Sequence, residues 1–196
     1  MLNVKKHIFL VILIIYIGLS FPYKIYAQKH KPVTRVLFIF DASQSMYAQW
    51  DGNSRMEIAK ELLSNMLDSL ENNENLQLGL RCYGHQKPSP PQDCRDTRLE
   101  VPFGNNTIPA IKNRLKTLRP KGTTPIAKAL ESGALDFPAV TSNSRNIVIL
   151  ITDGIEECGG DPCAVSRLYQ EKKIILKPFV IGIGFSEEYK KNFECV

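Results

Sequence analysis

A ten-residue stretch, Val36–Ser45, constrains the fold of this chain more than any other part of its sequence. The four residues that precede Asp41 are all apolar, which is typical of a strand buried on both faces of a parallel sheet. Asp41, Ser43 and Ser45 then follow at alternating positions. In open α/β sheets, ligands bind beyond the carboxyl ends of the strands. The stretch therefore predicts a central strand whose carboxyl end carries one carboxylate and two hydroxyl groups.

The rest of the chain alternates between strand and helix patterns. Ser54 and Glu57 form a capping-box pattern in front of a helical apolar stripe. This order predicts an α/β fold: a doubly wound, mostly parallel sheet with helices on both faces, in which the short 97–101 strand is an antiparallel edge. We expect strands over Val33–Phe40, Leu76–Tyr83, Thr97–Val101, Ile147–Ile151 and Ile174–Gly182, and helices that begin at Ser54, near Ile108, at Pro125 and at Asp161-Pro162.

The amino-terminal 27 residues have the order of a secretory signal peptide. Two lysines precede an apolar run from Ile8 to Phe21, and Ala27 offers a small residue before a cleavage site. The run is shorter than the roughly 20 apolar residues that a membrane span needs. We therefore predict a cleaved signal over residues 1–27 and a single domain over residues 28–196, with an uncleaved membrane anchor as the alternative.

Charge gives little support for a nucleic-acid partner. The 196 residues carry a formal net charge of +5. Removal of residues 1–27 takes away Lys5, Lys6 and Lys24 and no acid, which leaves +2. No helix carries a basic stripe, so we expect no nucleic acid to bind.

The five cysteines favour structural disulfides, because an exported chain meets an oxidising environment. Cys82 and Cys94 lie on either side of a proline-rich loop, which a bridge between them would close. Cys158 and Cys163 can pair with each other, or one of them with Cys195. A zinc site is less favoured, because the chain has no C-x-x-C pattern and few histidines.

Two further polar residues are expected to meet Asp41 at the same edge of the sheet. Asp153 follows the apolar run Ile147–Ile151, and Thr124 stands just before a predicted helix start. Hard oxygen donors suit a small, hard cation such as Mg²⁺. If the two central strands are parallel neighbours, the sequence predicts a metal site that contains Asp41, Ser43, Ser45, Thr124 and Asp153.

These residues resemble the metal-ion-dependent adhesion site (MIDAS) of von Willebrand factor type A (vWA) domains. Asp41, Ser43 and Ser45 match the D-x-S-x-S motif of that family, and Thr124 and Asp153 match its loop threonine and its T-D-G aspartate. The resemblance covers roughly Val33–Val196. Three stretches, Tyr83-Gly84-His85, Gly122–Ile126 and Thr152–Cys163, are similar to an exported bacterial branch akin to the A domains of calcium-activated chloride channel regulators.

The resemblance implies a Rossmann-like vWA fold and a non-catalytic function. The site would hold Mg²⁺, or Mn²⁺ or Ca²⁺ in its place, and an Asp or Glu of a partner protein would complete the metal shell. The protein would act outside the cytoplasm, in the periplasm, at the cell surface or as a secreted domain. Family members usually have another strand and a final helix after the region that matches Ile174–Gly184, and the resemblance implies that both are missing here or are supplied by another chain.

Two alternatives remain open for the same residues. Ser43 and Thr124 can simply cap helices while Asp41 ends a strand. A metal-dependent hydrolase of phosphate esters can also use an acidic sheet edge, since a bound cation activates water. Against the hydrolase, no general base is evident beside the motif.

Three other features have weaker interpretations. His85 can touch a ligand, but we favour a solvated loop histidine. Gly182-Ile183-Gly184 lacks the third glycine of a dinucleotide fingerprint and is better explained as a strand exit. Tyr47 and Trp50, close to the motif, can face a partner or pack locally.

Overall fold

The structure is a computed structural model that describes residues 32–139, 144–171, 178–184, 189 and 193. These residues belong to one compact unit, Lys31–Val196. The predicted signal peptide and Cys195 lie outside the described residues. No helix among the residues described is long and apolar enough to cross a membrane.

A five-stranded sheet forms the centre of the fold, in the order β5-β4-β1-β6-β7. β1 pairs in parallel with β4 and with β6, β7 pairs in parallel with β6, and β5 is the antiparallel edge strand. The predicted doubly wound, mostly parallel sheet is therefore confirmed. The elements are β1 (Val33–Asp41), the short helix η1 (Gln44–Tyr47), β2 (Gln49–Trp50), β3 (Asn53–Ser54), α2 (Arg55–Ser69), β4 (Leu76–Tyr83), β5 (Thr97–Gly104), α3 (Ile108–Thr117), α4 (Ile126–Asp136), β6 (Ser144–Thr152), α5 (Pro162–Glu171) and β7 (Pro178–Gly182).

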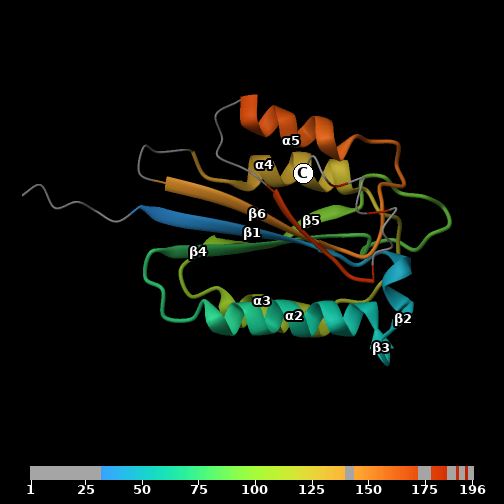
Figure 1. Ribbon diagram of the computed structural model, residues 1–196, viewed down its shortest axis with the longest axis horizontal. Helices are drawn as coiled ribbons and strands as arrows, with labels where there is room; N and C mark the ends of the chain where they lie inside the picture. The colour runs from blue at the N-terminus through green and yellow to red at the C-terminus, as the bar shows by residue number, and fades with distance from the viewer. Residues whose placement is uncertain (1–31, 140–143, 172–177, 185–188, 190–192, 194–196) are drawn as a thin grey trace, which may run out of the picture. The chain divides into compact units, whose positions relative to one another are not determined.

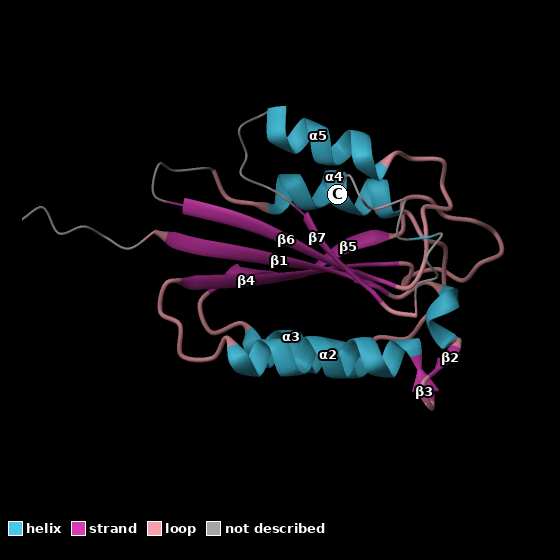
Figure 2. Cartoon of the chain, viewed as in Figure 1, coloured by secondary structure: helices cyan, strands magenta, loops and turns pink. Residues whose placement is uncertain are grey.

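Helices cover both faces of the sheet, with α2 and α3 on one face and α4 and α5 on the other (Figure 1). β1 lies in the middle, and its alternate side chains enter two separate cores. Figure 2 shows one layer of helices on each side of the sheet. Phe38 and Phe40 pack in the core with α2 and α3, and Leu37 and Ile39 pack in the core with α4 and α5. All four are fully buried. Burial of one such side chain stabilises a fold by about 1.5–3 kcal/mol, which explains why this segment is continuously apolar.

The helix starts agree with the sequence to within one residue. Ser54 caps α2 with a complete capping box, in which its hydroxyl accepts from the Glu57 N–H and Glu57 accepts from the Ser54 N–H. Pro125 was expected at the first helical position, but α4 begins at Ile126 and Pro125 flanks it. Its ψ of 67° keeps Pro125 outside the helical region. The strand predicted from Ile174 is described only from residue 178 onward.

The predicted bridge between Cys82 and Cys94 was wrong, and so was a bridge from Cys158 to Cys163 or Cys195. The alternative bridge between Cys163 and Cys195 stays a prediction. Cys94 is bonded to Cys158, and Cys82 is free and buried. Cys82 points from β4 into the core under α2 and α3, so it cannot reach the loop that carries Cys94. Cys163 is also disulfide-bonded. Because none of Cys94, Cys158 and Cys163 is a thiolate, these residues do not form the alternative zinc site.

Candidate metal site

The two predicted carboxylates emerge at the same edge of the sheet because β1 and β6 are parallel neighbours. Phe40 of β1 is level with Ile151 of β6 in the strand register. Asp41 ends β1, and Asp153 follows the last residue of β6. Both are at most 1% exposed. The structure thus confirms the predicted arrangement of these two acids.

A continuous chain of hydrogen bonds joins Asp41 to Asp153 through the two serines. The Ser43 N–H donates to Asp41 Oδ1 at 2.7 Å, and the Ser43 and Ser45 hydroxyl oxygens are 3.0 Å apart. Ser45 Oγ donates to Asp153 Oδ1 at 2.7 Å. Since that bond uses the only hydroxyl hydrogen of Ser45, Ser43 must donate in the serine–serine contact. Both lone pairs of Ser43 Oγ therefore remain available to a cation.

The loop that carries Thr124 lies against the same turn. Ser43 forms a bridge with Gly122, and the Gln44 N–H donates to the Gly122 carbonyl at 2.8 Å. A Cβ placed on Gly154 would be 3.8 Å from Ser45 Oγ and 3.9 Å from Thr124 Cγ2. Thr124 and Ser45 therefore both lie next to Gly154, the residue that follows Asp153. The structure brings all five predicted residues to one place.

Gly84 allows the three loops of the site to approach one another this closely. Its φ of +67° is a left-handed conformation that glycine adopts without a steric penalty. A Cβ at this position would lie 2.6 Å from the Thr123 carbonyl oxygen and 2.8 Å from the Ser43 Cα. The Gly84 carbonyl also accepts from the Gly122 N–H at 2.8 Å. The loop after β4 can therefore hold the other two loops only with glycine here.

The helix-capping alternative does not explain the two hydroxyl residues. Ser43 precedes η1, but its side chain makes no capping hydrogen bond. Thr124 is not the N-cap of α4, which is Pro125. Ser43 and Thr124 are nevertheless buried, at 1% exposure each. Their position is accounted for by the cluster at the sheet edge rather than by a helix start.

Asp41 receives two further hydrogen bonds that sequence reasoning missed. Tyr83 Oη donates to Asp41 Oδ2 at 2.8 Å, and Thr152 Oγ1 donates to the same oxygen at 2.7 Å. Tyr83 and Thr152 are the last residues of β4 and β6, the two strands beside β1. The available signal was a polar group at the end of each neighbouring apolar strand. These bonds fix the orientation of the Asp41 carboxylate.

The electrostatics of Asp41 favour a bound cation. Burial and the charge of Asp153 raise the pKa of Asp41 to about 6, against the lowering effect of hydrogen bonds from Ser43 and Thr152. Burial and the Asp41 charge also hold the pKa of Tyr83 well above its usual range. Two carboxylates that repel each other in a buried place are stabilised when a positive charge comes between them.

One positive side chain already faces the site. Arg55 Nη1 lies 2.9 Å from Asp153 Oδ2, and the Arg55 side chain is 25% exposed. Arg55 is the first residue of α2, directly after the capping serine. Its role was missed because nothing in the local sequence connects it to a residue 98 positions away. Arg55 therefore shares the Asp153 carboxylate with any metal at the site.

The residues present fit a hard divalent cation. Asp41 and Asp153 supply the negative charge, and Ser43, Ser45 and Thr124 supply neutral hydroxyl oxygens, which are the ligands that Mg²⁺ and Ca²⁺ prefer. In the described part of the chain, no three His, Cys, Asp or Glu residues are grouped so as to hold a metal. That result excludes an acid-rich or histidine site there, and it is consistent with a site of two acids and three hydroxyls.

His85 is not the solvated loop histidine that we expected. It is buried, and its Nε2 lies 2.6 Å from Glu100 Oε1. Arg98 and Arg114 also contact Glu100 at 2.6 Å. Burial raises the pKa of Glu100, but the hydrogen bonds from Arg98, His85 and Arg114 outweigh it and hold the value at about 2. His85 belongs to this ion cluster between β4 and β5.

Trp50 and Gly184 lie beside the site. Gly184, in the predicted strand exit after β7, has a φ of +67° and approaches both Trp50 and the Arg55 guanidinium. Trp50 is 43% exposed and Tyr47 is 56% exposed. Trp50 thus packs locally against Gly184 and also presents part of its surface to solvent, and a partner-facing role stays a prediction.

A cleft at the opposite end of the sheet does not contain the candidate metal site. It has a volume of about 540 Å³ and is lined by the turns before β4 and after β5, including Asn72, Glu74 and Asn106. These turns lie at the amino end of β4, whereas Asp41 lies at the carboxyl end of β1. The five candidate metal ligands therefore do not line that cleft.

Comparison with known proteins identifies the family. The model of the von Willebrand factor type A domain matches residues 36–194. The chain belongs to the von Willebrand factor type A domain family.

Two Bacillus subtilis (strain 168) proteins, each named only as uncharacterized, are similar in sequence. YwmD is 32% identical over 173 residues, which cover 86% of this chain and 75% of YwmD. YwmC is 31% identical over 170 residues, with 85% and 73% covered.

Solved structures show the same vWA fold. The pilus adhesin SpaC from Lactobacillus rhamnosus GG superposes with a TM-score of 0.65 and 18% identity, over 86% of this chain and 28% of SpaC. The PilB minor pilin from Streptococcus sanguinis superposes with a TM-score of 0.62 and 15% identity, over 85% of this chain and 54% of PilB. This chain thus spans about a quarter to a half of those proteins, and at such identities the similarity shows the fold alone.

Proposed function

We propose that this protein is an exported, non-catalytic vWA domain that binds a protein partner through a divalent cation of MIDAS type. Asp41, Ser43, Ser45, Thr124 and Asp153 would hold the ion, Mg²⁺ or in its place Mn²⁺ or Ca²⁺. The observation that carries the proposal is the unbroken hydrogen-bonded chain from Asp41 to Asp153, with the Thr124 loop packed against it.

The charge of the site supports a partner that offers a carboxylate. Only two carboxylates of this set face a 2+ ion, and Asp153 already shares its charge with Arg55. The two carboxylates balance the charge of the ion, and the Arg55 guanidinium leaves the site with one positive charge in excess. The ion can therefore accept an outside Asp or Glu oxygen as a further ligand. The vWA family and the fold shared with a pilus adhesin and a minor pilin support the coarser role in protein interaction.

Several features support export. The amino-terminal sequence has the pattern of a signal peptide. Cys94, Cys158 and Cys163 are disulfide-bonded, which is typical of proteins outside the cytoplasm. The SpaC and PilB proteins, which share the fold, are a pilus adhesin and a minor pilin. The finer resemblance to the A domains of calcium-activated chloride channel regulators stays a prediction.

Isothermal titration of the protein with Mn²⁺ and Mg²⁺ tests the metal site. We expect one ion per chain, and loss of at least about a hundredfold in affinity in Asp41→Ala, because that change removes one of the two carboxylates. Thermal unfolding controls for the fold of the variant. A protein with unchanged affinity after this substitution would rule out the site.

The partner is tested with the immobilised protein. Proteins retained in Mg²⁺ should be released by EDTA, and the Asp41→Ala protein should not retain them. Retention that is indifferent to both changes contradicts the proposal. Turnover of a generic phosphoester by the wild type, abolished in Asp41→Asn, would instead favour the metal-dependent hydrolase.

A further inference from the structure

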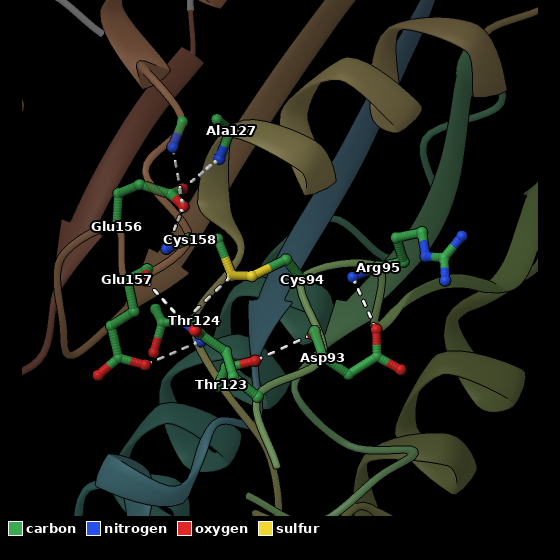
Figure 3. Close-up of a disulfide and its surroundings, with 11 residues drawn as sticks. Asp93, Cys94, Arg95, Thr123, Thr124, Ala127, Glu156, Glu157 and Cys158 are labelled. Atoms are coloured by element: carbon green, nitrogen blue, oxygen red, sulfur yellow. Dashed lines mark hydrogen bonds between the residues drawn. A yellow bond between two sulfur atoms is a disulfide. The ribbon is translucent and has the colours of Figure 1, made fainter. Parts of the chain in front are cut away.

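Glu157 connects the two loops that carry Thr124 and Asp153. The Glu157 N–H donates to the Thr124 carbonyl at 3.2 Å, and Glu157 Oε2 accepts from the Thr124 N–H at 3.1 Å. Figure 3 shows this reciprocal pair beside the disulfide. Both main-chain polar groups of Thr124 are therefore held by one residue of the loop that begins at Asp153.

Glu156 anchors the start of α4 to the same loop. Its Oε2 accepts from the Ala127 N–H at 2.7 Å, and its Oε1 accepts from the Cys158 N–H at 2.7 Å (Figure 3). A carboxylate at a helix amino terminus is favourable, because the first N–H groups lack partners within the helix and carry partial positive charge. Glu156 thus fixes the helix that follows Thr124.

The Cys94–Cys158 disulfide adds a third loop, the one between β4 and β5. It joins residues 64 positions apart and lies next to Glu157 in the sequence. The Thr123 hydroxyl donates to the Asp93 carbonyl at 3.0 Å. Gln92 Nε2 donates to the Glu157 carbonyl at 2.7 Å. Asp93, next to Cys94, therefore bonds to Thr123, and Glu157, next to Cys158, bonds to Thr124.

We propose that Glu157 and the Cys94–Cys158 disulfide are positioning residues for the metal site. They hold Thr124 in place beside Asp153 before an ion binds, and so they set the affinity for the ion. The inference rests on the proposed function above. Its physical reason is preorganisation: a loop that is already ordered does not lose its conformational freedom when the ligand binds. Residues that orient metal ligands typically change metal affinity by about 10–100-fold when they are substituted.

Substitution of Glu157 tests the proposal with the disulfide intact. In Mn²⁺ titrations of the full chain, Glu157→Ala should bind about tenfold more weakly than the wild type. Glu157→Gln should restore most of the affinity, because its amide oxygen can accept from the Thr124 N–H. Glu61→Ala, on the exposed side of α2, is the matched control and should not change the affinity.

Substitution of both cysteines tests the disulfide. Cys94→Ser with Cys158→Ser should weaken Mn²⁺ binding by at least about tenfold at a temperature where circular dichroism shows the fold intact. A double variant is preferable to a reducing agent, because Cys163 is also disulfide-bonded. If the double variant does not fold, the Glu157 series decides the question.

The outcomes separate this inference from the proposed function. A wild-type chain that binds no Mn²⁺ overturns the proposed metal site and the positioning role with it. A wild-type chain that binds Mn²⁺, together with Glu157→Ala of equal affinity, overturns the positioning role and leaves the metal site standing. Loss of stability in Glu157→Ala without loss of affinity also overturns it, since a merely structural residue would give that result.

Discussion

The two parts of the candidate metal site are built in different ways. The local corner, Asp41, Ser43 and Ser45, comes from five consecutive residues at the end of β1. The Ser43 N–H closes this turn on Asp41 itself, at 2.7 Å. The bridged corner, Thr124 and Asp153, comes from two separate loops. It is held by Glu157 and by a disulfide to a third loop.

Because the two corners are held in different ways, they should tolerate different substitutions. The local corner depends on a strand buried on both faces and on the spacing of its residues, so changes elsewhere should affect it little. The bridged corner depends on contacts between segments far apart in the sequence. Its geometry should respond to substitutions at residues that are not themselves ligands, such as Glu157.

Gly84→Ala should have the largest effect of the substitutions considered, because Gly84 lies against the loops of both corners. The new Cβ would lie 2.6 Å from the Thr123 carbonyl oxygen and 2.8 Å from the Ser43 backbone. Left-handed strain and overpacking each cost roughly 1–3 kcal/mol, so we expect a loss of about 3 kcal/mol in the free energy of unfolding, measured by denaturant titration.

Gly52→Ala is the matched control for Gly84. Gly52 also has a positive φ, +86°, but nothing lies within 4 Å of the added Cβ. Gly52→Ala should therefore lower the free energy of unfolding only through backbone strain, by about 1 kcal/mol. Equal losses for the two variants would show that the close approach of the loops at Gly84 does not contribute to stability.

A change of pH should act on the local corner through Asp41. The pKa of Asp41 is about 6, because burial and Asp153 disfavour its charge. A cation requires the ionised carboxylate, so a proton competes with the metal once the pH falls below this value. Titration calorimetry should show Mn²⁺ affinity about tenfold lower at pH 5 than at pH 7.

The same shift has an opposite consequence for the metal-free protein. Because the pKa of Asp41 in the folded protein is raised above its ordinary value of 3.8, the folded state binds more protons than the unfolded state between about pH 4 and pH 6. The contribution of Asp41 to stability should therefore increase as the pH falls through this window. Thermal unfolding of wild type and Asp41→Asn, compared across these pH values, isolates the contribution. Parallel curves for the two proteins would contradict the assignment.

Arg55→Ala should have the smallest effect, and it acts on the bridged corner. Arg55 and the metal share the Asp153 carboxylate, with Arg55 Nη1 2.9 Å from Oδ2. Removal of this partly exposed charge should tighten Mn²⁺ binding by about threefold, within the range of a partly exposed ion pair. Arg167→Ala on α5, which removes an exposed ion pair with Asp161, is the control. Weaker binding in Arg55→Ala would show that Arg55 supports the site rather than competes for it.

Much of the fold could be predicted because its signals are local. The apolar run before Asp41 and the capping box at Ser54 each act over a few residues, and the structure contains both the central strand and the helix start. The single-residue error at Pro125 has the same cause, since a helix boundary depends on the ψ angle of one residue. The parallel arrangement followed from the alternation of strands and helices along the chain.

Other parts of the site could not be predicted, because their partners lie far apart in the sequence. Cys82 is nearest to Cys94 along the chain, but its side chain is buried in the opposite direction, and Cys94 reaches Cys158 instead. Tyr83 was visible only as a polar residue at the end of its strand, and its bond to Asp41, 42 positions away, depends on the pairing of β4 with β1. His85 is paired with Glu100 of the neighbouring edge strand, and Glu100 also contacts Arg98 of that strand and Arg114 of α3.

The sequence by itself determined the strand, the turn after it and the set of oxygen-bearing side chains, since periodicity and spacing act through neighbouring residues. Only the tertiary structure decided how those side chains are held. The orientation of Asp41 by Tyr83, the ion pair of Arg55 with Asp153, and the fixing of Thr124 by Glu157 all require the packed sheet. Long-range contacts of this kind form once the strands are in register, and that register is a property of the whole core.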